Sequence, residues 1–325
     1  MLKRRTLLAS SAALSLAAPA IVDAQSPWPA RTIRYILPFA PGGGTDTSAR
    51  LMADQLTRAL GVQVIVENRG GAGGNIGTTE LARAAPDGYT IGLISVASHT
   101  INPMLYTKMP YDADKDIVPV SLIAMLSNLL GVAPSLPVKN VPELIALCKK
   151  EPGKYAFASS GPGSSLHLSG ELFKAMAGVD IVHVPYKGAG PAYPDLMAGT
   201  VHMMFANISS MLGNVRANKI KGLAVTSAER SKAIPELPTI GETLPGYVAT
   251  SWYGIGVPAG TPEPIVAKLE ATITGILAKK EIVDRFTGDL GMDMPSPGRK
   301  GLQAFIDKDR ALWAPAVKAS GVKFE

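Results

Sequence analysis

Glycine and hydroxyl residues gather at four points of this chain where an apolar run gives way to an amphipathic one. These corners are Pro41–Asp46, Gly70–Asn75, Ser159–Ser165 and Lys187–Pro191. At a turn from a strand into a helix, the first backbone N–H groups have no partner within the helix and lie at the positive end of its dipole. An anion can bind there without a catalytic side chain. One such corner is typical of an ordinary turn with a helix cap, whereas all four together favour close approach of the backbone to a ligand.

A carboxylate is the anion that fits corners of this kind. Each charge-assisted hydrogen bond to it contributes roughly 1.5–3 kcal/mol, and three or four of them support binding at about micromolar concentration. No arginine is required for this. Arg69 and Lys187 lie beside two of the corners, and we expect both at the solvated surface.

Other chemistries lack the residues that they need. The glycine runs match neither the dinucleotide GxGxxG pattern nor the GK[ST] ending of a P-loop. The histidines show no metal-binding spacing, so we expect no metal and no cofactor. Ser164 and His167 could approach each other on a helix, which leaves an exported serine hydrolase as an alternative, although there is no GxSxG elbow. The single cysteine, Cys148, lies on an apolar helical face and is predicted to be a buried thiol.

The N-terminus has the pattern of an export signal. Lys3, Arg4 and Arg5 precede an apolar stretch, and Val22-Asp23-Ala24 is a small-residue cleavage site. We expect cleavage after Ala24, and the paired arginines are also compatible with the twin-arginine route. Without residues 1–24 the formal charge falls from +6 to +4, because three cations and one carboxylate are lost. The remaining cations are scattered, which argues against nucleic-acid binding.

The order of apolar runs predicts an α/β protein with two lobes. Strands and helices alternate from Ile33 to Val96, and a second such series runs from Tyr155 to Thr226. Extended segments at Val118–Leu126, Leu129–Ala133 and Thr250–Gly260 lie between the series or after them. The late amphipathic helices must pack on a sheet, and we expect this to be the sheet of the first lobe. The chain should therefore return to the first lobe through two crossing strands. The predicted division is 25–125 with 249–325 for lobe 1, and 126–248 for lobe 2.

At this point the chain resembles a known family, the extracytoplasmic solute receptors of tripartite tricarboxylate transporters, also called Bug or TctC proteins. The resemblance spans the mature chain and rests on PFAPGGGTD, VENRGGAGGNIGT, DGYTIGLIS, YAFASSGPGSSLHLSGELF, VHVPYKGAGPAYPDLMAG and SWYGIGVPAGTP. It implies a type II periplasmic binding protein fold that closes on its ligand like a Venus flytrap, with no catalysis. It also implies a periplasmic location, partnership with the membrane subunits of such a transporter, and ligand carboxylates held by backbone amides, hydroxyls and waters. We expect a monomer.

The resemblance also marks the positions that should contact the ligand. Matched residue by residue, they are Phe39, Ala40, Gly42, Gly43, Thr45, Asp46, Asn75, Ser95, Ser159, Ser160, Gly161, Ser164, His167, Lys187, Gly188, Ala189 and Asn207. Trp252 is expected to pack at the hinge. Gly70 and Pro162 depart from the residues common in the family at these loops, which affects loop shape and hence ligand size.

Two questions stay open from the sequence. Asp46 is either a helix cap or an acceptor for a ligand amino or hydroxyl group, and capping fits better beside an anionic ligand. The family's ligands range from simple di- and tricarboxylates to amino acids, aromatic acids and vitamins, so the sequence does not fix the ligand. A receptor that presents its ligand to a membrane sensor, rather than to a transporter, would have the same motifs.

Overall fold

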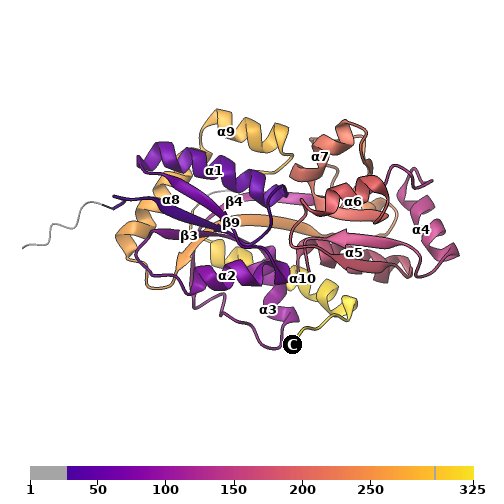
Figure 1. The fold of residues 1–325 in the computed structure, drawn as a ribbon, viewed down its shortest axis with the longest axis horizontal. Coiled ribbons are helices and arrows are strands. Elements are labelled where there is room, and N and C mark those ends of the chain that lie inside the picture. Colours follow the sequence, from indigo (N-terminus) through magenta and orange to yellow (C-terminus); the bar gives the residue numbers. More distant parts are fainter. Residues whose placement is uncertain (1–27, 296–297) are drawn as a thin grey trace, which may run out of the picture.

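The computed structural model describes residues 28–295 and 298–325. The predicted export signal, residues 1–24, lies outside the described residues. Nine strands form one continuous, twisted sheet with helices on both faces (Figure 1). The strands are β1 (Ile33–Leu37), β2 (Val64–Asn68), β3 (Thr90–Ser95), β4 (Ile117–Val132), β5 (Ala156–Ser159), β6 (Val182–Pro185), β7 (Met203–Asn207), β8 (Lys221–Val225) and β9 (Thr250–Pro258).

The strand order divides the sheet into two halves. The order is β2-β1-β3-β9-β4-β7-β5-β6, and β8 also pairs with β4. The pairs of β1 with β2 and β3, and of β5 with β6 and β7, are parallel, whereas β4 and β9 pair antiparallel with their neighbours. We call β1–β3 with β9 and the start of β4 the first lobe, and β5–β8 with the end of β4 the second lobe. The fold is the predicted two-lobed α/β architecture.

Strand β4 is shared by the two lobes. Its residues Ile117–Ser127 pair with β9, and Asn128–Val132 pair with β7 and β8. Two separate extended segments were predicted here, and that was wrong because the polar pair between them does not break the strand. Asn128 is fully buried, donates to Ser169 Oγ at 2.9 Å and accepts from the Asn207 amide at 2.8 Å. A buried polar residue with its hydrogen bonds satisfied can stay in a strand.

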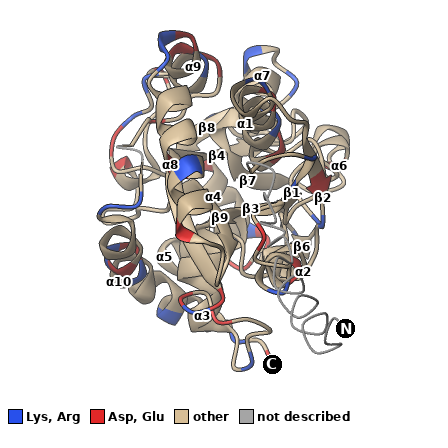
Figure 2. Ribbon diagram, turned by 90° about the vertical axis from the view of Figure 1, so that its left-hand side faces the viewer, with Lys and Arg blue, Asp and Glu red and all other residues tan. Residues whose placement is uncertain are grey.

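The helices pack on the sheet through faces on which apolar residues recur at helical spacing. In order they are α1 (Gly44–Leu60), α2 (Asn75–Ala82), α3 (Asn102–Leu105), α4 (Val141–Lys150), α5 (Ser165–Ala177), α6 (Ala192–Ala198), α7 (Ile208–Arg216), α8 (Glu263–Leu277), α9 (Lys280–Asp284) and α10 (Leu302–Ser320), with short helical turns η1 (Ala72–Gly74), η2 (Ala97–Ile101), η3 (Ile240–Glu242) and η4 (Arg285–Asp289). Along α1, Ala49, Met52 and Leu56 are buried on one face. The charged residues lie mostly on outer helices and loops, such as α8, α9 and α10 (Figure 2).

Trp252 and Cys148 have the environments that the sequence predicts. Trp252 lies on β9, is 1% exposed and donates from its indole Nε1 to Asp309 of α10 at 2.8 Å. Helix α10 packs against both η2 and α5, so it contacts both lobes. Cys148 is buried and free, and burial raises the pKa of its thiol to about 11. Within residues 28–295 and 298–325, no helix has the length and apolar composition that spanning a membrane requires.

Candidate ligand-binding site between the lobes

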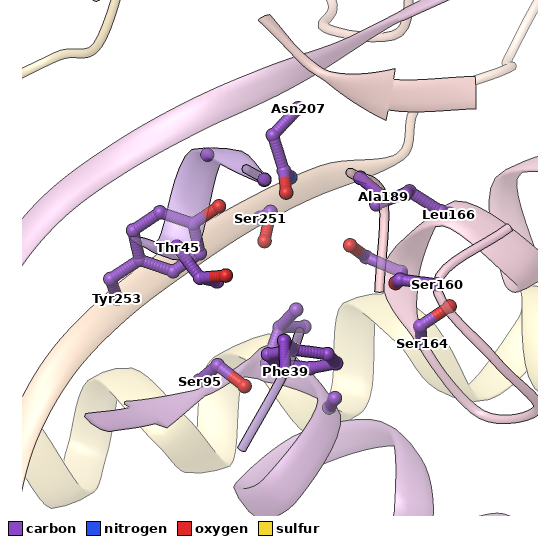
Figure 3. A pocket seen from close by; sticks show the side chains of 15 residues that line it. Phe39, Thr45, Ser95, Ser160, Ser164, Leu166, Ala189, Asn207, Ser251 and Tyr253 are labelled. Carbon is purple, nitrogen blue, oxygen red and sulfur yellow. The ribbon is translucent and has the colours of Figure 1, made fainter. Parts of the chain in front are cut away.

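A cavity lies between the lobes where three helices begin. Helix α1 comes from the first lobe, and α5 and α7 come from the second. The lining residues are Phe39, Gly43, Gly44, Thr45, Ser95, Val96, Ala97, Ser160, Ser164, Ser165, Leu166, Ala189, Asn207, Ser251 and Tyr253 (Figure 3). The helices begin after the N-caps Gly43, Ser164 and Asn207, all of which line the cavity. Three positive helix ends from two lobes therefore converge on one space.

The cavity wall carries no ionisable cation. Every lining residue is glycine, an apolar residue, an amide or a hydroxyl residue. An anion there would be held by N–H groups of the helix starts and by hydroxyls, which is the arrangement that the four corners suggest. Among the described residues, no group of three or more histidine, cysteine or acidic side chains is placed to hold a metal ion.

Two hydroxyls that line the cavity are buried without a protein partner among the described residues. They are Ser95 Oγ, at the end of β3, and Tyr253 Oη, on β9. Ser95 is 3% exposed and Tyr253 is 1% exposed. Burying an unpaired polar group costs about 1–3 kcal/mol, so each such group requires an explanation. A ligand acceptor in the cavity would satisfy both.

The lobes touch each other around the cavity. Ala40 N donates to Lys187 O across the lobes at 3.0 Å. A Cβ added to Gly190 would lie 2.0 Å from Pro41 O, and one added to Gly73 would lie 1.8 Å from Pro162 O. The first corner therefore contacts the fourth, and the second contacts the third. The structure gives many of the corner glycines a role that the sequence did not predict, since they admit the backbone of the opposite lobe.

This close contact leaves little room inside. The cavity has a volume of about 20 Å³, enough for about one water molecule. The structure therefore represents a closed arrangement, in which the side chains of the cavity wall must move to admit an organic ligand.

The predicted site residues fall into two groups. Eight of them line the cavity: Phe39, Gly43, Thr45, Ser95, Ser160, Ser164, Ala189 and Asn207. The other nine are outside its wall: Ala40, Gly42, Asp46, Asn75, Ser159, Gly161, His167, Lys187 and Gly188. Ligand contact by any of them stays a prediction.

Most residues of the second group hold the loops around the cavity. Ser159 Oγ pairs with His183 Nε2 at 2.6 Å, and Asn75 Oδ1 accepts from Asn102 Nδ2 at 2.8 Å. Gly188 lies against Ala40 across the lobes, and a Cβ there would meet Ala40 N at 2.8 Å. The Lys187 side chain is exposed, as expected for a solvated lysine. These side chains and backbone groups position the loops from behind the wall.

Sequence reasoning missed seven lining residues. They are Gly44, Val96, Ala97, Ser165, Leu166, Ser251 and Tyr253. Ser251 and Tyr253 were detectable, because Thr250–Gly260 was predicted to be extended and alternate residues of a strand share a face. With Trp252 assigned to packing, its two neighbours had to face the other side.

Asp46 neither caps α1 nor lines the cavity. The N-cap is Gly43, so the expected capping by Asp46 was wrong. The Asp46 carboxylate instead accepts from Gly42 N at 3.2 Å, Arg50 Nε at 3.0 Å and Asn68 Nδ2 at 3.1 Å. Burial alone would raise the pKa of Asp46, but the hydrogen bonds from Arg50, Asn68 and Gly42 hold the pKa below its usual value. The carboxylate ties the first corner to α1 and to the end of β2.

We expect Asp46→Ala to lower the free energy of unfolding by about 1–3 kcal/mol, because three donors lose a buried charged acceptor. Asp54→Ala is the matched control, since Asp54 pairs with Arg58 at the same i, i+4 spacing on α1 but is solvent exposed. Its effect should stay within about 0.5 kcal/mol. Urea unfolding of both variants measures the difference, and equal losses would contradict the role assigned to Asp46.

Ser164 and His167 are not arranged as a nucleophile and base. Ser164 Oγ donates to Gly161 O at 2.7 Å and accepts from the backbone N–H of His167 at 3.2 Å, as a helix cap does. The His167 ring accepts from Gly163 N through Nδ1 at 3.2 Å, and Nε2 faces Glu171 at 3.7 Å. A hydrolase would need a ring nitrogen on the serine hydroxyl, and the hydrogen bonds found in the described structure place both groups elsewhere.

Comparison with known proteins adds independent information. The family model described as "Tripartite tricarboxylate transporter family receptor" matches residues 48–322. The chain belongs to this receptor family. The predicted family is thereby confirmed.

Solved structures of similar proteins agree with this family. A Rhodopseudomonas palustris protein solved with adipate is 36% identical, with a TM-score of 0.88, over 92% of this chain and 100% of that one. The periplasmic binding protein BugD is 34% identical, with a TM-score of 0.87 and the same coverage. MatC from Rhodopseudomonas palustris, with bound malate, is 34% identical, with a TM-score of 0.85, over 89% and 100% of the two chains. Proteins of this family are periplasmic receptors.

Proposed function

We propose that this protein is a periplasmic solute receptor that captures a small carboxylate between its lobes. The observation that carries the proposal is the convergence of three helix N-termini from both lobes on a cavity whose wall has no cation. Helix ends and hydroxyls stabilise an anion that bridges the lobes, so the ligand itself favours the closed state. The similar proteins solved with adipate and with malate support the same ligand class.

Family membership identifies the partner that we propose for the loaded receptor, namely the membrane subunits of a tripartite tricarboxylate transporter. We infer that the chain is exported, is cleaved after Ala24 and acts as a monomer. The proposed lobes are 25–125 with 249–325, and 126–248. These boundaries lie next to the point where β4 changes partners, and next to the start of β9.

Isothermal titration calorimetry with a panel of small organic acids tests the proposal. We expect saturable binding of at least one acid with a Kd of about 1 μM or lower, which corresponds to about 8 kcal/mol. The amide of the same acid is the matched control and should bind at least tenfold more weakly, because it lacks the charge that the helix ends stabilise. Equal affinity for acid and amide would contradict a carboxylate site, and binding of no acid would contradict the receptor function.

A further inference from the structure

Two buried hydroxyls lie side by side on neighbouring strands at the first-lobe end of the cavity. The antiparallel register of β3 and β9 places Ser95 directly opposite Tyr253. Opposed residues of an antiparallel pair project to the same face of the sheet. Both side chains line the cavity, and neither hydroxyl has a hydrogen-bond partner in the part of the chain that the structure describes.

The start of α1 lies next to this pair. A Cβ on Gly44 would come 3.3 Å from Tyr253 Oη, so the bare Cα of Gly44 lets the phenol reach the helix start. Gly44 and Thr45 belong to the first turn of α1, whose N–H groups have no partner within the helix. Burial raises the pKa of Tyr253 well above 10, so its hydroxyl keeps its proton and can donate. In Figure 3 Thr45 lies beside the Tyr253 ring.

A second set of polar groups lies across the cavity. Ser160 and Ser164, at the third corner and the start of α5, face it from the second lobe (Figure 3). Phe39 lies between the two sets in the same view. The site thus has two ends on different lobes, each made of uncharged donors and a helix start.

We propose that Ser95, Thr45 and Tyr253 form a second carboxylate-binding end of the site, and that Tyr253 is the residue that makes the receptor prefer diacids to monoacids. This inference rests on the proposed function. One carboxylate would be held at the α5 end, and the other would accept from Tyr253 Oη and Ser95 Oγ at the α1 end. A monoacid of the same length would leave both hydroxyls buried and unpaired, which disfavours its binding.

Calorimetry with matched ligand pairs tests this, using succinate against butyrate and adipate against hexanoate. We expect the wild type to bind one diacid at least tenfold more tightly than its matched monoacid. Tyr253→Phe should lower the affinity for that diacid about tenfold or more and leave the affinity for the monoacid unchanged. Ser95→Ala should change the two affinities in the same direction, and it provides a second test of the inference if Tyr253→Phe folds poorly.

Tyr35→Phe is the matched control. Tyr35, on β1, also has a buried hydroxyl without a partner among the described residues, but it does not line the cavity. The same atom is removed, and the affinity for both acids should stay at the wild-type value. A wild type that binds none of these acids overturns the inference, and calorimetry with the broader acid panel then decides whether the proposed function fails with it.

Three outcomes overturn the inference alone. The first is a wild type that binds a diacid while Tyr253→Phe and Ser95→Ala bind it equally well. The second is a variant that loses affinity for the diacid and its matched monoacid by the same factor, because the hydroxyls would then support the whole site and not its second end. The third is a wild type that binds acids without preferring diacids.

Discussion

Gly73→Ala should lower the affinity for the bound acid at least about 100-fold. Gly73 has a φ of 61°, and a Cβ there would lie 1.8 Å from the carbonyl oxygen of Pro162 on the opposite lobe. The overlap is with backbone, which cannot rotate away, so the lobes must stay apart at this point. The apparent affinity falls by the fraction of molecules that can still close. Calorimetry measures the loss, and small-angle scattering should show that saturating acid no longer makes the variant more compact.

Gly178→Ala is the control for the backbone strain. Gly178 ends α5 with the same φ of 61°, but a Cβ there has no atom within 4 Å. Both variants should lose about 1 kcal/mol of stability, because alanine is disfavoured at positive φ. Only Gly73→Ala should lose binding. If Gly73→Ala closes and binds as Gly178→Ala does, the contact between the second and third corners is not part of the closed state.

The second large effect is a loss of stability in mild acid, caused by two buried histidines, His99 and His167, and a partly buried one, His183. His167 and His183 stack with ring centroids 4.1 Å apart, and Phe157 stacks on both rings. Burial, together with the charge of His183, lowers the pKa of His167 to about 3, and burial lowers the pKa of His183 to about 4. His99, fully buried against Trp252, has its pKa lowered by burial to about 4.

The direction of this pH dependence follows from the number of protons that the folded and unfolded states each bind. In the unfolded chain these histidines bind a proton below about pH 6.5, whereas in the folded chain they stay neutral until about pH 4. The unfolded state is therefore favoured as the pH falls through this window. Between pH 6.5 and 5 each histidine should remove about 1.5 kcal/mol from the free energy of unfolding, and the three together about 4–5 kcal/mol.

Urea unfolding at several pH values between 6.5 and 5 measures this slope. Burial raises the pKa of Glu171, close to His167, and of Asp309, so these carboxyls act in the opposite direction. Burial also lowers the pKa of His202, which acts in the same direction as the other histidines. His183→Phe keeps an aromatic ring in the stack and should reduce the slope by about one third. A free energy of unfolding that stays constant between pH 6.5 and 5 would show that these histidines are protonated in the folded protein.

The sequence was most informative where local chemistry decides the structure. Glycine and hydroxyl runs mark turns before helices, and for that reason residues such as Gly43, Thr45 and Ser164 could be placed around one cleft from the sequence alone. The two crossing strands were expected because the late helices need the sheet of the first lobe to pack on. These features depend on residues close together in the chain.

The features of the fold and of the site that could not be predicted depend on contacts between segments far apart in the chain. Tyr253 lies directly opposite Ser95 because β9 pairs with β3 in one register, and a shift of one residue would break this pairing. Asp46 faces away from the cavity because Asn68, at the end of β2, offers it a donor. The corner glycines make room for the opposite lobe, and no local pattern shows which backbone will approach them.

The position of β9 also determines the order in which the protein can be completed during synthesis. In the first-lobe sheet, β9 lies between β3 and β4, although it follows β4 by more than a hundred residues in the chain. Until β9 has been made, the facing edges of β3 and β4 have no partner at that point, and open strand edges invite association between chains. The second lobe is contiguous and has all its strands by Val225. The lobe that begins first is therefore the one that is finished last.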